Sequence, residues 1–304
     1  MRNTRLAFIG GSGMYNIEGM RITDRLTIKT PFGKTSDAIL IGTFNDKDHI
    51  AFLARHGRGH RLLPTEVPSR ANIWALKKIG VEYIVSLSAV GSLRESMAPK
   101  HLVIPDQLID RTRYRPESSY FGEGIAGHVS FASPYCEELR EVLLGAACQC
   151  AVEAHDENAA QADAVVHDGG TLLCVEGPMF STRAESMLYR SWNIDIIGMT
   201  ALPETRLARE AEIGYAALAL VTDYDCWHTG EEAVTNGMVV ETMRANTALA
   251  QQIIRHLAAR QHLLPKTCSC HIAAADSIMT REDAFPKKTK KTLALFYGKY
   301  WGSR

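Results

Sequence analysis

Long apolar runs are missing from this sequence of 304 residues, and none approaches the roughly 20 apolar residues that a membrane-spanning helix requires. A net charge is missing as well, since 34 lysine and arginine residues balance 34 aspartate and glutamate residues. Because the chain has no net charge, it does not attract nucleic acid or a membrane surface through its overall electrostatic field. We therefore expect a small-molecule partner. The first residues lead into an apolar strand pattern instead of a signal peptide, so we expect a cytoplasmic protein.

Cysteine is also too scarce for a disulfide framework, because the chain holds only seven, an odd number. Three of them have the apolar neighbours typical of small core residues: Cys136, Cys174 and Cys226. The others form two C-x-C pairs, Cys148/Cys150 and Cys268/Cys270. Two such pairs are too few and too closely spaced for an ordinary structural zinc site.

What the sequence does have is the composition of a large α/β domain, with 46% hydrophobic and 22% charged residues. Short apolar runs alternate with helical patterns, which predicts a mainly parallel sheet with helices packed on it. The expected strands are residues 6–9, 38–42, 50–54, 83–89, 171–176, 194–197 and 217–221. The expected helices are residues 68–78 and 134–150, one across 184–188, one from Pro203, 235–259, and one after Pro286.

Two carboxylates, Asp223 and Asp225, directly follow the strand expected at residues 217–221. This continuous apolar run is typical of a parallel strand that is covered on both faces. Ligands of open α/β sheets bind outside the carboxyl ends of the strands, so we interpret both aspartates as site residues. A D-x-D metal motif of a nucleotide-sugar glycosyltransferase is an alternative reading of the same two residues.

Three other expected strands end in turns suited to an anion. Gly10-Gly11-Ser12-Gly13 offers backbone N–H groups and a hydroxyl, although a plain tight turn explains it equally well. Arg55 and His56 open a glycine-containing loop, and Ser88 lies in a turn of small residues. Three such turns on one chain favour a shared phosphate site over ordinary connections or a surface arginine.

The stretch at residues 107–133 has no clear periodicity and contains Arg111, Arg113, Arg115 and His128. Several aromatic residues within it argue against disorder. Because long loops in compact enzymes are usually functional, we expect an irregular functional loop here.

Nine short motifs, in order between about residues 5 and 260, closely resemble the 5'-methylthioadenosine phosphorylases of the trimeric purine nucleoside phosphorylase family. They are Gly10-Gly11-Ser12-Gly13, Thr30-Pro31-Phe32-Gly33, Arg55-His56-Gly57, residues 71–76, Gly91-Ser92-Leu93-Arg94, residues 109–112, residues 176–181, Met199-Thr200 and residues 222–227. The resemblance implies a single α/β domain with a mixed, barrel-like central sheet flanked by helices. It further implies a homotrimer without metal or cofactor. The implied reaction, in purine and methionine salvage, is reversible phosphorolysis of S-methyl-5'-thioadenosine with inorganic phosphate as co-substrate.

The resemblance also assigns roles to individual residues. The phosphate ligands would be Ser12, Arg55, His56, Ser88, Ala89 and Thr200. The nucleoside would contact Met199 under the ribose, Phe180 on the base, Asp223 and Asp225 at adenine, and His128 lent by a neighbouring subunit. Asp223 would be the catalytic acid. Ser181 together with Asp223 points to a 6-aminopurine, because the related 6-oxopurine enzymes have Glu and Asn at these places.

Two positions depart from the family pattern. Pro68-Ser69 replaces the usual Asn-Tyr before an expected helix, and Asn236 replaces a common Val beside the 5'-methylthio group. A polar Asn236 side chain in the pocket would tolerate a 5'-hydroxyl, and one turned outward would have no such effect. A broader nucleoside phosphorylase that also accepts adenosine or 6-oxopurine nucleosides is therefore an alternative.

Residues 1–265 form the expected phosphorylase domain, and residues 266–304 form a C-terminal extension. Lys287 to Lys291 precede several large apolar residues, which predicts a terminal helix docked on the domain. The alternative is a basic amphipathic tail that binds membranes or nucleic acid. In that case the protein could be a non-catalytic nucleotide-binding module that acts through this tail.

Overall fold

The computed structural model describes residues 4–11, 14, 17–115, 117–157, 164–228 and 236–302 of the chain. The strands are β1 (Leu6–Gly10), β2 (Arg21–Leu26), β3 (Ile39–Thr43), β4 (His49–Ala54), β5 (Tyr83–Ser92), β6 (Leu102–Ile104), β7 (Gln107–Arg111), β8 (Val166–Asp168), β9 (Thr171–Val175), β10 (Ile196–Gly198) and β11 (Gly214–Asp223). The α-helices are α1 (Ser69–Lys78), α2 (Glu137–Glu157), α3 (Arg183–Ser191), α4 (Ala201–Glu210), α5 (Asn236–Arg260) and α6 (Lys287–Tyr297). Short 3₁₀ turns connect some of them, including η3 (Asp225–Trp227) and η5 (Ser269–Ile272).

The strands form one mixed sheet in the order β2-β3-β4-β1-β5-β10-β9-β7, with β11, β6 and β8 branching from β5. Strands β1, β4, β5 and β11 run parallel to their neighbours within this group, whereas β10 is antiparallel to β5. The expectation of an α/β fold with a mixed central sheet flanked by helices is confirmed.

Strand β5 changes partners along its length. Its register with β1 ends at Leu87, opposite Gly10, and its register with β10 begins at Gly91, opposite Ile197. Residues 88–90 therefore lie between two diverging strands. Ligands of open α/β sheets bind where the strand order switches in this way, so the topology favours a ligand site after Leu87.

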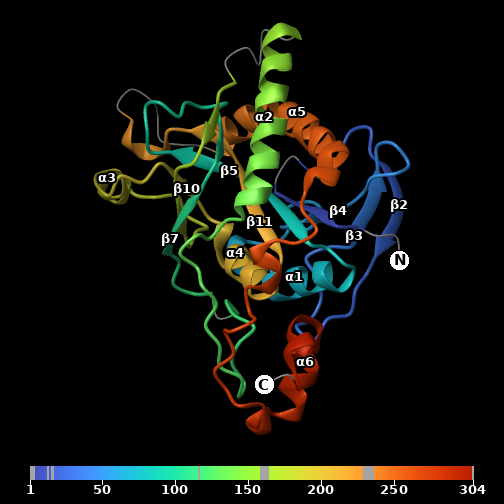
Figure 1. Ribbon diagram of the computed structural model, residues 1–304. Helices are drawn as coiled ribbons and strands as arrows, with labels where there is room; N and C mark the ends of the chain where they lie inside the picture. Colours follow the sequence, from blue (N-terminus) through green and yellow to red (C-terminus); the bar gives the residue numbers. More distant parts are fainter. Residues whose placement is uncertain are drawn as a thin grey trace.

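Helices cover the sheet on both faces. Helices α2 and α5 lie side by side (Figure 1), and their apolar residues join one core cluster with β5 and β11. Helices α1 and α4 pack with residues of β1 and β4 in a second cluster. Strands β1 and β11 are buried along their full length, as expected of apolar runs between two helical layers. Among the described residues, no helix combines the length and apolarity that crossing a membrane requires.

The C-terminal helix α6 packs next to α1 at one end of the molecule (Figure 1). Leu293, Phe296 and Tyr297 are buried in the second core cluster, while four of the five residues from Lys287 to Lys291 are lysines, three of them exposed. The Tyr300 hydroxyl donates to Glu212 over 2.6 Å, which adds a polar contact to the docked face. The division of the chain at residues 265 and 266 stays a prediction.

Four strands were not anticipated. Strand β2 lies at the sheet edge without a buried residue, so its sequence shows no apolar alternation. Strands β6 and β8 have three residues each, too short for a periodic signal. The stretch expected to be irregular from residue 107 begins with β7, so this expectation is wrong for its first five residues.

Candidate functional site

Three predicted anion-binding turns meet at one level of the sheet. Gly10 of β1 pairs with Ala54 of β4 on one side and with Leu87 of β5 on the other. The residues that follow this row, Arg55 and Ser88, therefore lie beside the Gly10 turn, where β1 and β4 end and β5 continues. Strand β11 continues the row, because Ala219 pairs with Ser88 and Leu220 with Ala89. Ser12 itself lies outside the described residues.

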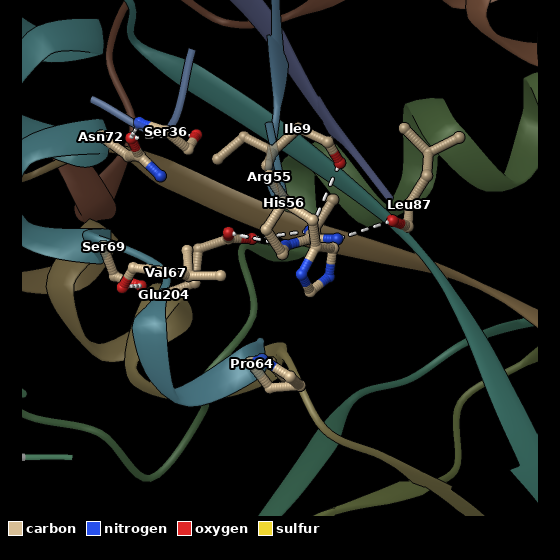
Figure 2. A network of polar contacts seen from close by, with 12 residues as sticks. Ile9, Ser36, Arg55, His56, Pro64, Val67, Ser69, Asn72, Leu87 and Glu204 are labelled. Carbon is tan, nitrogen blue, oxygen red and sulfur yellow. Dashed lines mark hydrogen bonds and ion pairs between the residues drawn. The ribbon is translucent and has the colours of Figure 1, made fainter. Parts of the chain in front are cut away.

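Arg55 is almost fully buried, with 1% of its surface exposed. Its guanidinium donates from Nε and Nη2 to both oxygens of Glu204, each over 3.0 Å. Further bonds run to the Leu87 carbonyl (3.0 Å), the Ser86 hydroxyl (2.6 Å) and the Ile9 carbonyl (3.3 Å), as Figure 2 shows in part. The arginine thus ties together the ends of β1, β4 and β5 and the helix α4. Its Nη1 atom lies 3.6 Å from the place where a Cβ on Gly11 would be, so it borders the glycine turn.

His56 is also buried, and its Nδ1 lies 2.8 Å from the Leu62 carbonyl. A ring nitrogen facing a carbonyl must carry the proton, which leaves Nε2 as the acceptor of the neutral ring. Burial, and next the neighbouring Arg55 charge, lower the pKa of His56 from 6.5 to about 4. The imidazole is therefore neutral near pH 7 in the free protein. An anion beside it would supply the negative charge that favours the protonated ring.

Glu204 and Arg115 organise the site but were not singled out as site residues from the sequence. Glu204 holds Arg55 and also accepts from the Tyr215 hydroxyl over 2.7 Å. Arg115 donates to carbonyls on three site loops: Pro64 (2.8 Å), Glu176 (3.0 Å) and Met199 (3.1 Å). The signal for Arg115 was its place among three arginines in an aromatic loop, whereas Glu204 lies in a helix with other charged residues and had no distinguishing local signal.

Asp223 ends β11 opposite Gly91 of β5, Asp225 follows directly, and each is 7% exposed. The Asp223 carboxylate accepts from the Thr222 hydroxyl over 2.7 Å and from the Asp225 backbone N–H over 2.8 Å. Gly91 of β5 faces the pair, because a Cβ there would lie only 3.0 Å from Asp223 Oδ1. The absence of a side chain at Gly91 therefore permits the close approach.

The Asp225 carboxyl is the less satisfied of the two. Its Oδ2 is buried without a hydrogen-bond partner among the described residues, and the Ser186 hydroxyl lies nearby without a well-formed bond to it. Burial, and then the neighbouring Asp223 charge, raise the pKa of Asp225. Its backbone also has a positive φ of 52°, which is uncommon outside glycine and costs energy that functional sites often store. A buried acid with an unused oxygen and a raised pKa can hold a proton for transfer.

The loop at residues 176–181 lies beside the two aspartates. The Cys226 thiol donates to the Ser181 carbonyl over 3.2 Å, which places the loop beside η3 and Asp225. Phe180 is 46% exposed, so its ring is available to a ligand. Gly177, with φ of 68°, packs under Met199, because a Cβ there would lie 2.6 Å from its sulfur. Thr200 follows directly as the residue before α4, and its hydroxyl caps no helix N–H group.

Of two further predicted residues, one lies beside the C-terminal segment and the side chain of the other is not described. His128 is exposed, and its backbone N–H donates to the Ser277 carbonyl over 2.8 Å. Asn236 is the first residue of α5, and its side chain lies outside the described residues. Pro68 precedes α1 directly, so the unusual Pro68-Ser69 pair is compatible with a helix start there.

Comparison with known proteins gives consistent results. The model of the phosphorylase superfamily matches residues 5–259. S-methyl-5'-thioadenosine phosphorylase of Gloeobacter violaceus is 48% identical over 296 residues, covering 97% of this chain and 96% of the relative. The protein of the same name from Chloroflexus aurantiacus is 48% identical over 301 residues, covering 99% and 100%.

Two solved structures have the same fold at substantial identity. A methylthioadenosine phosphorylase from an antarctic soil metagenomic library has a TM-score of 0.88 and 45% identity, covering 97% of this chain and 99% of that one. The Schistosoma mansoni methylthioadenosine phosphorylase in complex with adenine has a TM-score of 0.78 and 32% identity, covering 97% and 98%.

Proposed function

Because this chain belongs to the phosphorylase superfamily, we propose that it catalyses the reversible phosphorolysis of S-methyl-5'-thioadenosine to adenine and 5-methylthioribose 1-phosphate. Such an enzyme is a pentosyltransferase. The observation that supports the proposal is the strand pairing, which sets Ser88 and Ala89 of β5 opposite Ala219 and Leu220 of β11 and Gly91 opposite the buried Asp223, while Arg55 and His56 follow the nearby strand β4. The reaction needs a group of donors that binds phosphate and an acid that donates a proton to the purine.

The chemistry explains why both are needed. Breaking the N9–C1' bond leaves positive charge on the ribose and negative charge on the purine, while a phosphate oxygen forms the new bond to C1'. Preorganised donors must therefore hold the phosphate under the sugar. We assign that role to Ser12, Arg55, His56, Ser88, Ala89 and Thr200. Met199 would lie under the ribose and Phe180 against the base.

The Asp223–Asp225 pair would hold adenine. A protonated carboxyl group can donate to N7 as the electron pair of the broken bond moves onto the purine, and an ionised one can accept from the 6-amino group. Asp223 remains our candidate for the donor to N7. Because the raised pKa lies on Asp225, we infer that the pair as a unit carries the proton before it is passed on.

Specificity would depend on three further positions. Ser181 is small and neutral, so it offers no carboxylate to the N1–H of a 6-oxopurine. Asn236 would govern the preference between a 5'-methylthio and a 5'-hydroxyl group. His128 would complete the sugar pocket of a neighbouring subunit in a homotrimer, which fits its exposed position in the described chain. The full-length similarity to phosphorylases does not favour the glycosyltransferase or the nucleotide-binding module.

The test is incubation with methylthioadenosine, adenosine, inosine and methylthioinosine, each with and without phosphate, while the free base is followed. We expect phosphate-dependent release of adenine, fastest from methylthioadenosine, without a requirement for metal in catalysis. Base release that does not depend on phosphate, or release from the 6-oxo nucleosides alone, would contradict the proposal.

A further inference from the structure

Three cysteines from distant parts of the sequence meet in the folded chain. The sulfur atoms of Cys136, Cys268 and Cys270 all lie within 4.8 Å of one another, and all three residues are buried as free thiols. Cys136 directly precedes α2, and the other two belong to the C-terminal segment around η5. In the sequence, Cys268 and Cys270 form an isolated pair, and the fold brings Cys136 to them as a third thiol.

A carboxylate contacts two of the three thiols. Glu138 Oε2 lies 3.3 Å from Cys136 Sγ and 3.4 Å from Cys268 Sγ. The two sulfur atoms are themselves 3.6 Å apart. We call Cys136, Glu138, Cys268 and Cys270 the thiol cluster. Three thiols and one carboxylate form a donor set of soft sulfur with one oxygen, which suits zinc.

The three distances among Cys136, Cys268 and Glu138 match edges of a tetrahedral zinc centre. Zinc binds sulfur at about 2.3 Å and carboxylate oxygen at about 2.0 Å, so tetrahedral edges measure about 3.8 Å between sulfur atoms and about 3.5 Å between sulfur and oxygen. The thiol cluster shows 3.6 Å for one S–S edge and 3.3 and 3.4 Å for two S–O edges. A bonded disulfide would instead require about 2.05 Å between two sulfur atoms.

The surroundings fix the ligands in place. The Cys136 N–H donates to the Tyr215 carbonyl over 2.8 Å, which anchors this cysteine to the start of β11. The Cys270 N–H donates to Cys268 Sγ over 3.3 Å. Backbone donors of this kind stabilise bound thiolates and orient them for a metal. Arg209 adds positive charge next to Cys270.

From this geometry we propose that the thiol cluster binds one Zn²⁺ ion, with Cys136, Cys268 and Cys270 as thiolate ligands and Glu138 as the oxygen ligand. Binding releases the three thiol protons. The ion joins the C-terminal segment to the beginning of α2. Its role is structural, because Gly214 at the start of β11 adjoins Cys136, whereas Asp223 lies at the far end of the same strand. Ten strand residues span roughly 30 Å.

The test uses the full-length protein purified with a non-thiol reductant, stripped with a chelator and reloaded with Zn²⁺ or Co²⁺. We expect about one zinc per chain by elemental analysis after desalting. Cobalt should give the thiolate-to-metal charge-transfer band and the intense d–d bands of a tetrahedral site. Removal of zinc should lower the melting temperature by about 5 °C, because a ligand of the native state stabilises it by mass action.

Substitutions separate the ligands from other cysteines. Cys136→Ser and Cys270→Ser should each lose the bound zinc and the cobalt charge-transfer band, whereas Cys148→Ser, which removes an exposed cysteine on α2, should keep both. Glu138→Gln should retain the charge-transfer band but bind zinc at least tenfold more weakly. Since the stripped wild-type protein carries the key spectroscopic test, a variant that fails to fold does not decide the outcome.

Three results would overturn the proposal. Wild-type protein that takes up no zinc, or cobalt that binds without thiolate bands, would show that the thiol cluster is only a packed core. A count of five free thiols under denaturing, metal-free conditions, instead of the seven in the sequence, would show a disulfide in its place. Loss of phosphorolysis in the variants is not used as a criterion, so failure here leaves the proposed catalytic function untouched.

Discussion

Glu204→Gln should remove the ion pair that holds the Arg55 side chain in its position in the proposed phosphate site. Both side chains are 1% exposed, and the carboxylate accepts two bonds of 3.0 Å from the guanidinium. An amide has one oxygen to accept with, so one Arg55 N–H group would face an N–H group instead. Breaking a buried ion pair by removing one charge costs about 3–5 kcal/mol of unfolding free energy. Against a total of about 5–15 kcal/mol, this is a severe loss.

The same substitution should weaken phosphate more than nucleoside. If Arg55 contacts phosphate and is held in position by Glu204, misplacing one charged hydrogen bond costs about 1.5–3 kcal/mol, or roughly 10- to 100-fold in the KM for phosphate. Arg55→Ala should give the same selective rise. The assay measures adenine release as phosphate is varied at saturating nucleoside, and then as nucleoside is varied at saturating phosphate. Urea unfolding of each variant measures the loss of stability.

Glu210→Gln is the matched control on the same helix. Glu210 is also buried, but its carboxylate accepts from the Ser119 hydroxyl and the Tyr120 N–H instead of an arginine. Because burial raises the pKa of Glu210, its charge is held less strongly. We expect a loss of about 1 kcal/mol and an unchanged KM for phosphate. Equal effects of Glu204→Gln on the KM values of phosphate and nucleoside would refute the reasoning and make Arg55 purely structural.

Three other predictions concern the base, the pH dependence and the assembly. Asp223→Asn should lower kcat/KM for methylthioadenosine at least about tenfold and spare the activity on 6-oxo nucleosides. Adding Ser181→Glu should extend this shift in preference. If Asp223→Asn keeps the kcat/KM and the substrate preference of the wild type, Asp223 is structural. Because the folded-state pKa of His56 is about 4 against 6.5 unfolded, its contribution of about 3 kcal/mol is present above pH 6.5 and is lost as the pH falls toward 4. Urea unfolding across this range should show that loss in the wild type and a smaller one in His56→Asn, and parallel curves would contradict the assignment. In a homotrimer with shared pockets, the impaired His128→Ala and Asp223→Asn chains should regain activity on methylthioadenosine when they are refolded together. A fully active monomer in light scattering would exclude the shared site.

The parts of the fold that the sequence predicts best are those with a long periodic signal. The buried strands β1, β4 and β11 and the helix α1 were located within a few residues, because apolar runs and helix-ending glycines are local features. The edge strand β2 was missed because it buries no residue, and its pairing depends on β3. Pairing between distant segments leaves no trace in local periodicity.

The candidate site shows the same division. The residue types of the anion loop and the aspartate pair were visible in the sequence, whereas their supports were not. Glu204 lies 149 residues from Arg55, and Cys136 lies 132 residues from Cys268. Only the folded chain brings such pairs within bonding distance, so neither the buried ion pair nor the thiol cluster could be deduced from spacing along the chain.

The aspartate pair shows why even a well-placed motif needs the structure. In an uninterrupted strand, alternate residues point to the same face, so Val221 and Asp223 would share one environment. The pairing of β11 with β5 instead shifts its register between these two residues, and such irregularities re-aim side chains next to active sites. The left-handed backbone of Asp225 then turns its N–H onto Asp223. The sequence predicts two acids at a strand end, but only the folded chain shows the backbone bond between them and the Asp223 charge that helps to raise the pKa of Asp225.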